Sequence, residues 1–151
     1  MIEATEEDWN KCFDVGLKGY FFCTTTVMKG MMKRKSGCIV NVASVAAFHS
    51  SVNRAAYSIA KAGIAMMTRQ YAMELGPYNI RTNAIGPGLV PTPMNEDLRK
   101  DPELEKGIAA RTPLRRMGAV REVAAVALFL ASDAASFVNG VTILVDGGSA
   151  A

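Results

Sequence analysis

The chain has 151 residues, of which 50% are hydrophobic and 21% are charged, and its net charge at pH 7 is +3. This composition excludes an intrinsically disordered chain, and the length corresponds to one domain or part of one. The apolar runs are interrupted well before the roughly 20 residues that a membrane-spanning helix needs, which argues against a membrane protein.

Cys12, Cys23 and Cys38 are the three cysteines, and they form no Cys-x-x-Cys pair. An odd number of cysteines without a secretory signal sequence is typical of reduced thiols in a cytosolic compartment. We therefore expect a soluble cytoplasmic protein. The sequence shows no companion acidic residues that would suggest a metal site, so we expect none.

Helical and strand-like segments alternate along the chain. Thr5 followed by acidic residues is typical of a helix N-cap, whereas Ser36-Gly37 and Gly76-Pro77 are typical of helix ends. In chain order we predict helices over 5–15 and 19–35, a strand over 38–43, a helix over 54–75, a strand over 80–85, a loop over 86–93, a polar helical segment over 95–110, a helix over 120–131 and a strand over 141–145.

Strands that alternate with helices predict an α/β fold with a parallel sheet. Right-handed crossover connections would place the three strands side by side, with both faces of the sheet buried. The apolar strand over 38–43 would then lie at an edge of the sheet. An unpaired apolar edge favours association with another chain.

Three residues form a candidate proton-transfer site. Tyr57 and Lys61 are four residues apart in a predicted helix, so their side chains share one face. A neighbouring ammonium favours the phenolate and lowers the pKa of a phenol, which then works better as an acid or base near pH 7. Ser44 follows a predicted strand, where its hydroxyl can hydrogen-bond a substrate oxygen on which charge develops. This pattern indicates carbonyl or alcohol chemistry.

With these residues in place, the chain resembles the short-chain dehydrogenase/reductase family, of the classical type, from about Thr5 to Ser149. The family's catalytic serine precedes its tyrosine by thirteen positions, as Ser44 precedes Tyr57. Residues 79–88 resemble the family's next strand with its Pro-Gly exit, and residues 89–94 resemble the segment that meets the nicotinamide carboxamide. Residues 129–133 and 145–148 resemble the closing helix and the last strand.

The resemblance implies an NAD(P)-dependent oxidoreductase that interconverts an alcohol and a ketone or aldehyde, with NAD or NADP as cofactor and a small-molecule substrate. Ser44 would hold the substrate oxygen, Tyr57 would act as acid or base, and Lys61 would assist Tyr57 and contact the nicotinamide ribose. The stretch 92–112 would close over the substrate. The residues implied in cofactor binding are Tyr57, Lys61, Pro87, Gly88, Val90 and Thr92.

The chain departs from the family pattern in two places. The family's first strand and Gly-rich turn, which hold the pyrophosphate at a helix N-terminus, have no counterpart here. We therefore expect residues 1–151 to form a partial domain, a three-layer Rossmann-like sheet that lacks the N-terminal dinucleotide-binding strands, on the order of 60 to 90 residues. Gly16 stands where the family carries an active-site asparagine that helps to hold a water linked to the lysine.

A competing hypothesis is a truncated, catalytically inactive member of the family that acts as an oligomerisation or interaction module. The helices over 19–35 and 54–75 resemble those through which the family dimerises, so we expect a homodimer or homotetramer, or assembly with a chain that supplies the absent half. The basic run at 33–35 is explained by the dipole at a helix end, and we expect no nucleic-acid partner and no membrane partner.

Several candidates also have a purely structural interpretation. Ser44 could cap a turn, and Thr92 could cap a helix. Asn83 is expected to satisfy backbone groups at a strand end. His49, the only histidine, is expected to form a pocket wall or to face solvent.

Overall fold

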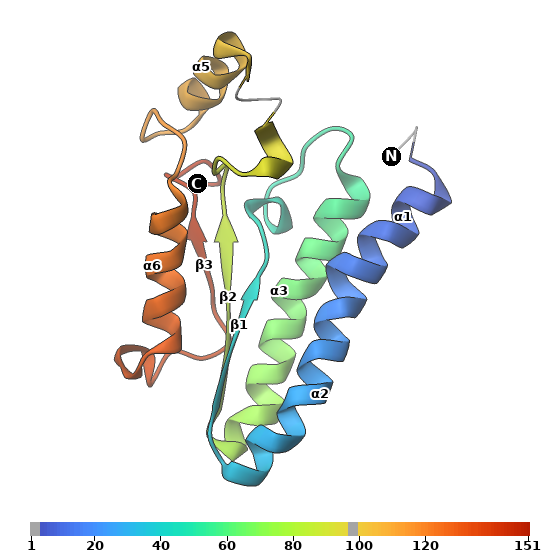
Figure 1. Cartoon of the computed structure of the whole chain (residues 1–151), viewed down its shortest axis with the longest axis vertical. Coiled ribbons are helices and arrows are strands. Elements are labelled where there is room, and N and C mark those ends of the chain that lie inside the picture. The colour runs from blue at the N-terminus through green and yellow to red at the C-terminus, as the bar shows by residue number, and fades with distance from the viewer. Residues whose placement is uncertain (1–3, 97–99) are drawn as a thin grey trace.

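The computed structural model describes residues 4–96 and 100–151, which form three layers (Figure 1). The strands are β1 (Gly37–Val42), β2 (Ile80–Pro87) and β3 (Thr142–Val145), and the helices are α1 (Glu6–Phe13), α2 (Gly19–Arg34), α3 (Ala55–Leu75), α5 (Pro102–Arg111) and α6 (Val120–Ala131). The strands form one parallel sheet in the order β1-β2-β3. Helices α2 and α3 cover one face of the sheet and α6 covers the other, which is the layered Rossmann-like arrangement predicted from the sequence.

The hydrophobic core lies mainly between the sheet and α3. Parallel strands are buried on both faces, and Ile80 and Ala84 of the central strand are 1% and 0% exposed. One core cluster joins Ala43, Ile64 and Ala84, with Leu17 and Tyr20 packed against it. A second cluster joins Tyr71, Leu75 and Ile80, with Met28, Met31, Met32, Ile39 and Met67 packed against it. The methionines of α2 therefore fill the core.

Helices α1 and α2 are joined without a break by the π-helix η1 (Asp14–Lys18), whereas the sequence predicted two separate helices. A π turn inserts an extra residue and changes the direction of the side chains around it. Leu17 of this turn packs against the first core cluster. Gly63 of α3 makes room for it, because a Cβ at position 63 would lie 2.9 Å from Leu17 Cδ2. The π turn thus allows close packing against α3.

The polar segment predicted over 95–110 is helical at Glu96 and Lys100 and over α5, but Asp101 is extended and interrupts it. Pro93–Asn95 forms a short 3-10 helix, and α5 starts only at Pro102. Asp101 is the N-cap of α5, and its carboxylate accepts hydrogen bonds from the backbone N–H groups of Glu103 and Leu104. A proline fits the first turn of a helix and disrupts the interior, so α5 cannot extend upstream through it. Residues 97–99 of the predicted segment lie outside the described residues.

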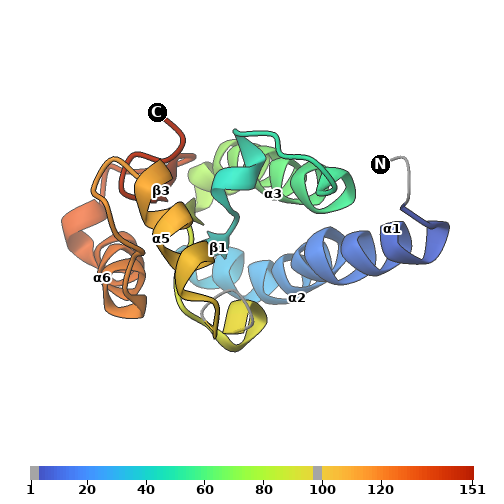
Figure 2. The same ribbon diagram turned by 90° about the horizontal axis from the view of Figure 1, so that it is seen from above.

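The carboxyl ends of β1 and β2 lie beside the first turn of α3, and α5 lies beyond these ends (Figure 1). In the view from above, α1 and α2 run side by side with α3 (Figure 2). Among the described residues, no helix combines the length and the apolar character that crossing a bilayer requires.

Candidate active site

A cavity of about 630 Å³ opens at the carboxyl ends of β1 and β2. Its walls come from the segment after β1, the first turns of α3, the loop after β2, the end of α5 and the C-terminal residues. Every residue that the sequence assigned to catalysis or cofactor binding lines this cavity, namely Ser44, Tyr57, Lys61, Pro87, Gly88, Val90 and Thr92. The structure therefore brings together side chains that lie up to 48 positions apart (92 − 44).

Ser44 follows β1 and is 8% exposed. The backbone N–H of Ala46 donates a hydrogen bond to Ser44 Oγ at 3.1 Å, so Ser44 caps the 3-10 helix over Val45–Ala47. The capping interpretation of this serine is confirmed, and it is compatible with a role in the cavity. Because Oγ only accepts in this bond, the hydroxyl proton of Ser44 can still be donated to a ligand oxygen.

Lys61 lies between two aromatic rings. Its Nζ donates a hydrogen bond to the backbone carbonyl of Val42 at 2.9 Å and lies 5.8 Å from the ring centroid of Tyr57 and 5.6 Å from that of Tyr20. An ammonium at this distance over a ring is attracted by its negative face. Burial lowers the pKa of Lys61 below its ordinary value. Tyr57 and Lys61 thus share one face of α3, as their spacing predicted.

Tyr20 is a neighbour of Lys61 that sequence reasoning missed. Its hydroxyl donates to the same Val42 carbonyl, at 3.0 Å. Burial, with a smaller contribution from Tyr57, raises the pKa of Tyr20. Tyr20 reaches the site through the packing of α2 against α3, which no local spacing in the sequence encodes.

Gly16 lies in η1, four residues before Tyr20. A Cβ at this position would lie 3.7 Å from Ala60 Cβ, which is an ordinary van der Waals contact. The glycine is therefore not required for packing here.

The loop after β2 is held by tight contacts and by an amide side chain. A Cβ at Gly88 would lie 2.8 Å from Asp146 Cα, so only glycine fits there without a shift of the backbone. Asn95 Nδ2 donates to the Val90 carbonyl at 2.7 Å, and the Thr92 N–H donates to Asn95 Oδ1 at 2.8 Å. Thr92 is the N-cap of the following 3-10 helix, as one interpretation of the sequence expected.

Two other residues have the structural positions that the sequence favoured. Asn83 is fully buried, where its Nδ2 donates to the Val138 carbonyl and its Oδ1 accepts from the Val141 N–H. His49 is exposed and lines the cavity wall.

Further lining residues were not named individually from the sequence, although four of them lie in the stretch 92–112 that was expected to close over the substrate. They are Ser51, Arg54, Asn95, Ile108, Arg111, Thr112, Ser149 and Ala150, among others. Arg54 precedes the first residue of α3, and Arg111 is the last residue of α5. Arg111 reaches the cavity because the folded chain places α5 beyond the carboxyl ends of the strands.

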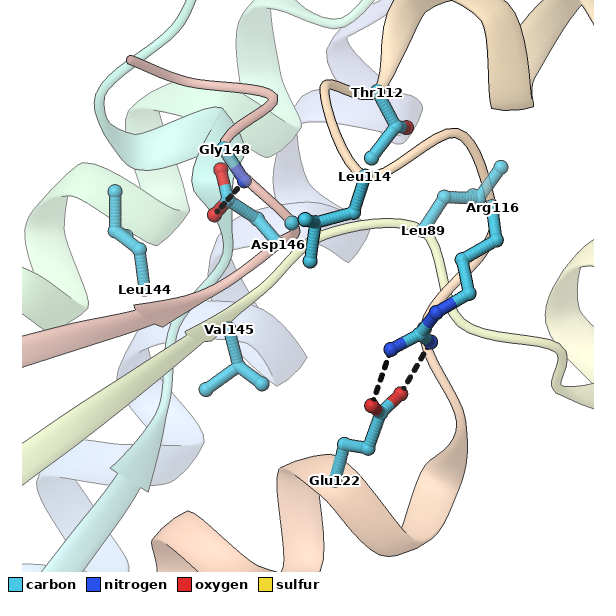
Figure 3. Close-up of a pocket in the computed structure, with 11 residues that line it drawn as sticks. Leu89, Thr112, Leu114, Arg116, Glu122, Leu144, Val145, Asp146 and Gly148 are labelled. Carbon is cyan, nitrogen blue, oxygen red and sulfur yellow. Dashed lines mark hydrogen bonds and ion pairs between the residues drawn. The ribbon is translucent and has the colours of Figure 1, made fainter.

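A second cavity, of about 500 Å³, lies between the end of β3 and the start of α6 (Figure 3). Arg116 and Glu122 form a two-pronged ion pair there, with N–O distances of 2.8 and 2.6 Å. The Arg116 hydrogen bonds, aided by the Ala119 N–H, lower the pKa of Glu122 to about 2. Asp146 accepts from the Gly148 N–H at 3.0 Å. Arg116, Glu122 and Asp146 thus each interact with other groups of the same chain.

The described residues contain no group of three or more histidine, cysteine, aspartate or glutamate side chains arranged to hold a metal ion.

Comparison with known proteins gives consistent matches over the whole chain. A family model described as Enoyl-(Acyl carrier protein) reductase matches residues 1–150. The 3-oxoacyl-[acyl-carrier-protein] reductase FabG of Thermotoga maritima is 44% identical over 149 residues, which are 98% of this chain and 59% of that protein.

Solved structures agree with this match. The gluconate 5-dehydrogenase of Burkholderia cenocepacia in complex with NADP and tartrate is 34% identical, with a TM-score of 0.94 over 97% of this chain and 58% of that one. A 3-oxoacyl-[acyl-carrier protein] reductase of Brucella melitensis with bound NAD is 38% identical, with a TM-score of 0.91 over 100% of this chain and 55% of that one.

The chain thus spans less than two thirds of the length of each of these relatives. Its sheet and helices nevertheless superimpose on theirs, and the family model covers nearly every residue. This chain belongs to the short-chain dehydrogenase/reductase family.

Proposed function

We propose that this chain carries the catalytic half of a nicotinamide-dependent oxidoreductase that interconverts an alcohol and a ketone or aldehyde of small size. The observation that supports this most is the convergence of Ser44, Tyr57 and Lys61 on one cavity with the loop after β2. The relatives named above are dehydrogenases and reductases, and two of them hold NADP or NAD. Residues 1–151 would then be a partial domain.

The loop after β2 offers the groups that a nicotinamide needs. It already binds one carboxamide, that of Asn95, through the Val90 carbonyl and the Thr92 N–H. The carboxamide of a nicotinamide has the same donor and acceptor, so it fits Val90 and Thr92 if Asn95 gives way. Pro87, Gly88 and the ammonium of Lys61 would line the remainder of the cofactor site. Since one relative holds NADP and another holds NAD, the similarity to these relatives indicates no preference for either nucleotide.

In the reducing direction, the bound nicotinamide would supply a hydride to the carbonyl carbon. Tyr57 would donate its proton to the carbonyl oxygen, which yields the alcohol and leaves a phenolate that solvent reprotonates. Ser44 would donate a hydrogen bond to the same oxygen while negative charge develops on it. The ammonium of Lys61 would stabilise negative charge on the Tyr57 oxygen. Oxidation would use the same steps in reverse.

The test is a titration of the purified chain with NADH and with NADPH, followed by fluorescence. Saturable binding in the micromolar range is expected. A Tyr57→Phe variant should keep this binding but lose at least about 100-fold in turnover of a carbonyl substrate, because it lacks the acid. Tyr78→Phe is a matched control, since Tyr78 is exposed and lies outside the cavity. Absence of saturation with both nucleotides would contradict the proposal.

A second candidate is a catalytically inactive module that joins copies of this chain or of its relatives. Exposed apolar side chains on α2 and α3 favour it; they include Phe21, Phe22, Val27, Ile59, Met66 and Met73. Either function is compatible with a homodimer or homotetramer through these helices. Self-association without nucleotide binding would favour the inactive module over the enzyme.

A further inference from the structure

The cavity that holds Ser44 and Tyr57 has an unbalanced charge. Its lining includes the cationic side chains of Arg54, Lys61 and Arg111, and no aspartate or glutamate among residues 4–96 and 100–151 lines it. A cavity wall with cations alone creates a positive potential, which low-dielectric surroundings strengthen.

This imbalance is local, because carboxylates occur close by in the chain. Glu96 follows the lining residue Asn95, and α5 carries Glu103 and Glu105, yet none of these acids lines the cavity while Arg111 at the end of α5 does. The second cavity, in contrast, contains carboxylates that balance its arginine (Figure 3). The positive wall is therefore a property of this one cavity.

The two arginines have no protein partner in the part of the chain that the structure describes. The guanidinium groups of Arg54 and Arg111 make no hydrogen bond or ion pair with the described residues, whereas Arg116 binds a carboxylate and Arg81 binds two backbone carbonyls. Burial opposes the charge of Lys61, and among the described residues its ammonium hydrogen-bonds only the neutral carbonyl of Val42. An anion that enters the cavity would meet two guanidinium groups whose donors no described residue occupies.

We propose that the cavity accepts a substrate with a carboxylate, a hydroxy acid or the corresponding oxo acid, and that Arg54 and Arg111 bind this carboxylate. The inference rests on the proposed function, since it places the reacting oxygen at Ser44 and Tyr57. Arg54 is the N-cap of α3 and Tyr57 lies in the first turn of that helix, so both residues are at the end of α3 that borders the cavity. A guanidinium binds a carboxylate through two parallel hydrogen bonds, which would orient the acid relative to the tyrosine.

The remaining wall suits a short carbon chain. Val45, Ala46, Val90 and Ile108 supply apolar surface to the wall of the same cavity. A substrate without an anionic group would leave both guanidinium groups without a charged partner.

Binding of succinate and of its neutral diamide, succinamide, to the full chain tests the inference by calorimetry at constant ionic strength. Succinate should saturate the chain, and succinamide should bind at least tenfold more weakly. Arg54→Gln and Arg111→Gln should each weaken succinate binding by roughly tenfold to a hundredfold, as expected for a lost charge-assisted hydrogen bond. Arg69→Gln is the matched control, since Arg69 is exposed on α3 and lines none of the described cavities. Equal binding of the two compounds, absence of succinate binding, or unchanged binding by both variants would overturn the inference.

NADPH binding to the same two variants shows whether the arginines bind a substrate carboxylate or the phosphates of a cofactor. NADPH affinity should stay unchanged in both arginine variants. If NADPH binding weakens while succinate binding does not, the arginines bind phosphate and the inference is wrong.

Turnover of an oxo acid and of its methyl ester separates this inference from the proposed function. Loss of both reactions, with succinate binding retained, would contradict only the proposed function, whereas equal turnover of acid and ester would contradict only the carboxylate site.

Discussion

Gly16 faces α3 one helical turn before Tyr20, at the position where the family carries an asparagine. The space around it accepts a side chain, because the nearest atom to a Cβ there is Ala60 Cβ at 3.7 Å. Residue 16 is also adjacent in space to the helix turn that carries Lys61. A polar side chain at this position could therefore bind water near the lysine without disturbing the packing of η1.

We expect Gly16→Asn to raise kcat for carbonyl reduction with little change in the KM for the nucleotide. Gly16→Ala is the matched control, because it adds a Cβ and improves helix propensity by up to about 1 kcal/mol without adding an amide. Steady-state kinetics and thermal unfolding of the three proteins check this. If alanine raises kcat as much as asparagine, the amide has no special role.

The residues of the candidate site differ in how far sequence could identify them. Tyr57 and Lys61 could be identified from the sequence because one helix carries both. Ser44 could be identified because its spacing from Tyr57 matches the family. Tyr20 and Arg111 were not, since they reach the cavity only through the positions of α2 and α5 in the folded chain. Spacing encodes neighbours within an element, but it does not encode which faces of distant elements meet.

At the scale of elements, β2 and β3 approach so closely at their carboxyl ends that Gly88 cannot be replaced without strain. We expect Gly88→Ala to destabilise the chain by about 1–3 kcal/mol, because its Cβ would lie 2.8 Å from the backbone of Asp146. The same change should weaken NAD(P)H binding by displacing the loop.

Gly107→Ala is the control for this substitution, since a Cβ at Gly107 in α5 would have no described atom within 4 Å apart from its chain neighbours and its own helix backbone. It should be neutral or stabilise by up to about 1 kcal/mol. Chemical denaturation gives the free energy of unfolding of both variants. Equal values would show that the ends of β2 and β3 leave room for a side chain at position 88.

The Arg116–Glu122 pair fixes the start of α6 and gives a pH-dependent contribution to stability. The folded-state pKa of Glu122 is about 2, below its ordinary value of 4.5, so this contribution is complete above pH 4.5 and is lost as the pH falls through 2. Glu122→Gln should lower the Tm at pH 7, and the difference from the unmodified chain should shrink at pH 3. Glu103→Gln, which affects an exposed pair with Lys106, should change the Tm little at either pH. A constant difference for Glu122→Gln would contradict the shifted pKa.

Most element positions followed from patterns of apolar, capping and helix-ending residues, and the strand order followed from crossover handedness. The π-helix η1 did not, because it depends on Leu17 packing into the space beside Gly63, 46 residues further along the chain (63 − 17). The start of α5 at Pro102 was readable from the proline and from Asp101 before it, but the polar character of the whole segment concealed the boundary.

At the scale of the whole molecule, apolar side chains remain exposed on the outer faces of α2 and α3. Phe22 is 55% exposed and Met66 is 60% exposed. Burial of such surface between copies would be favourable, so we expect a dimer or larger oligomer in sedimentation experiments. A monodisperse monomer that unfolds cooperatively would contradict this.

The double variant Phe22→Ser, Met66→Ser should shift the sedimentation equilibrium toward the monomer. Phe137→Ser is the control for surface hydrophobicity in general, because Phe137 is fully exposed and lies in the connection between α6 and β3, outside α2 and α3. An equal shift in the control would mean that association is not specific to α2 and α3.

The outer edge of β1 connects assembly with chemistry. Because the Ala43 N–H bonds to β2 and alternate residues of a strand direct their backbone groups to opposite sides, the Val42 carbonyl points to the open edge, where Lys61 and Tyr20 occupy it. A strand that docked along this edge as far as Val42 would compete for that oxygen. Docking would then release the Lys61 ammonium toward Tyr57, so that strand pairing at this edge and release of the lysine would be one event.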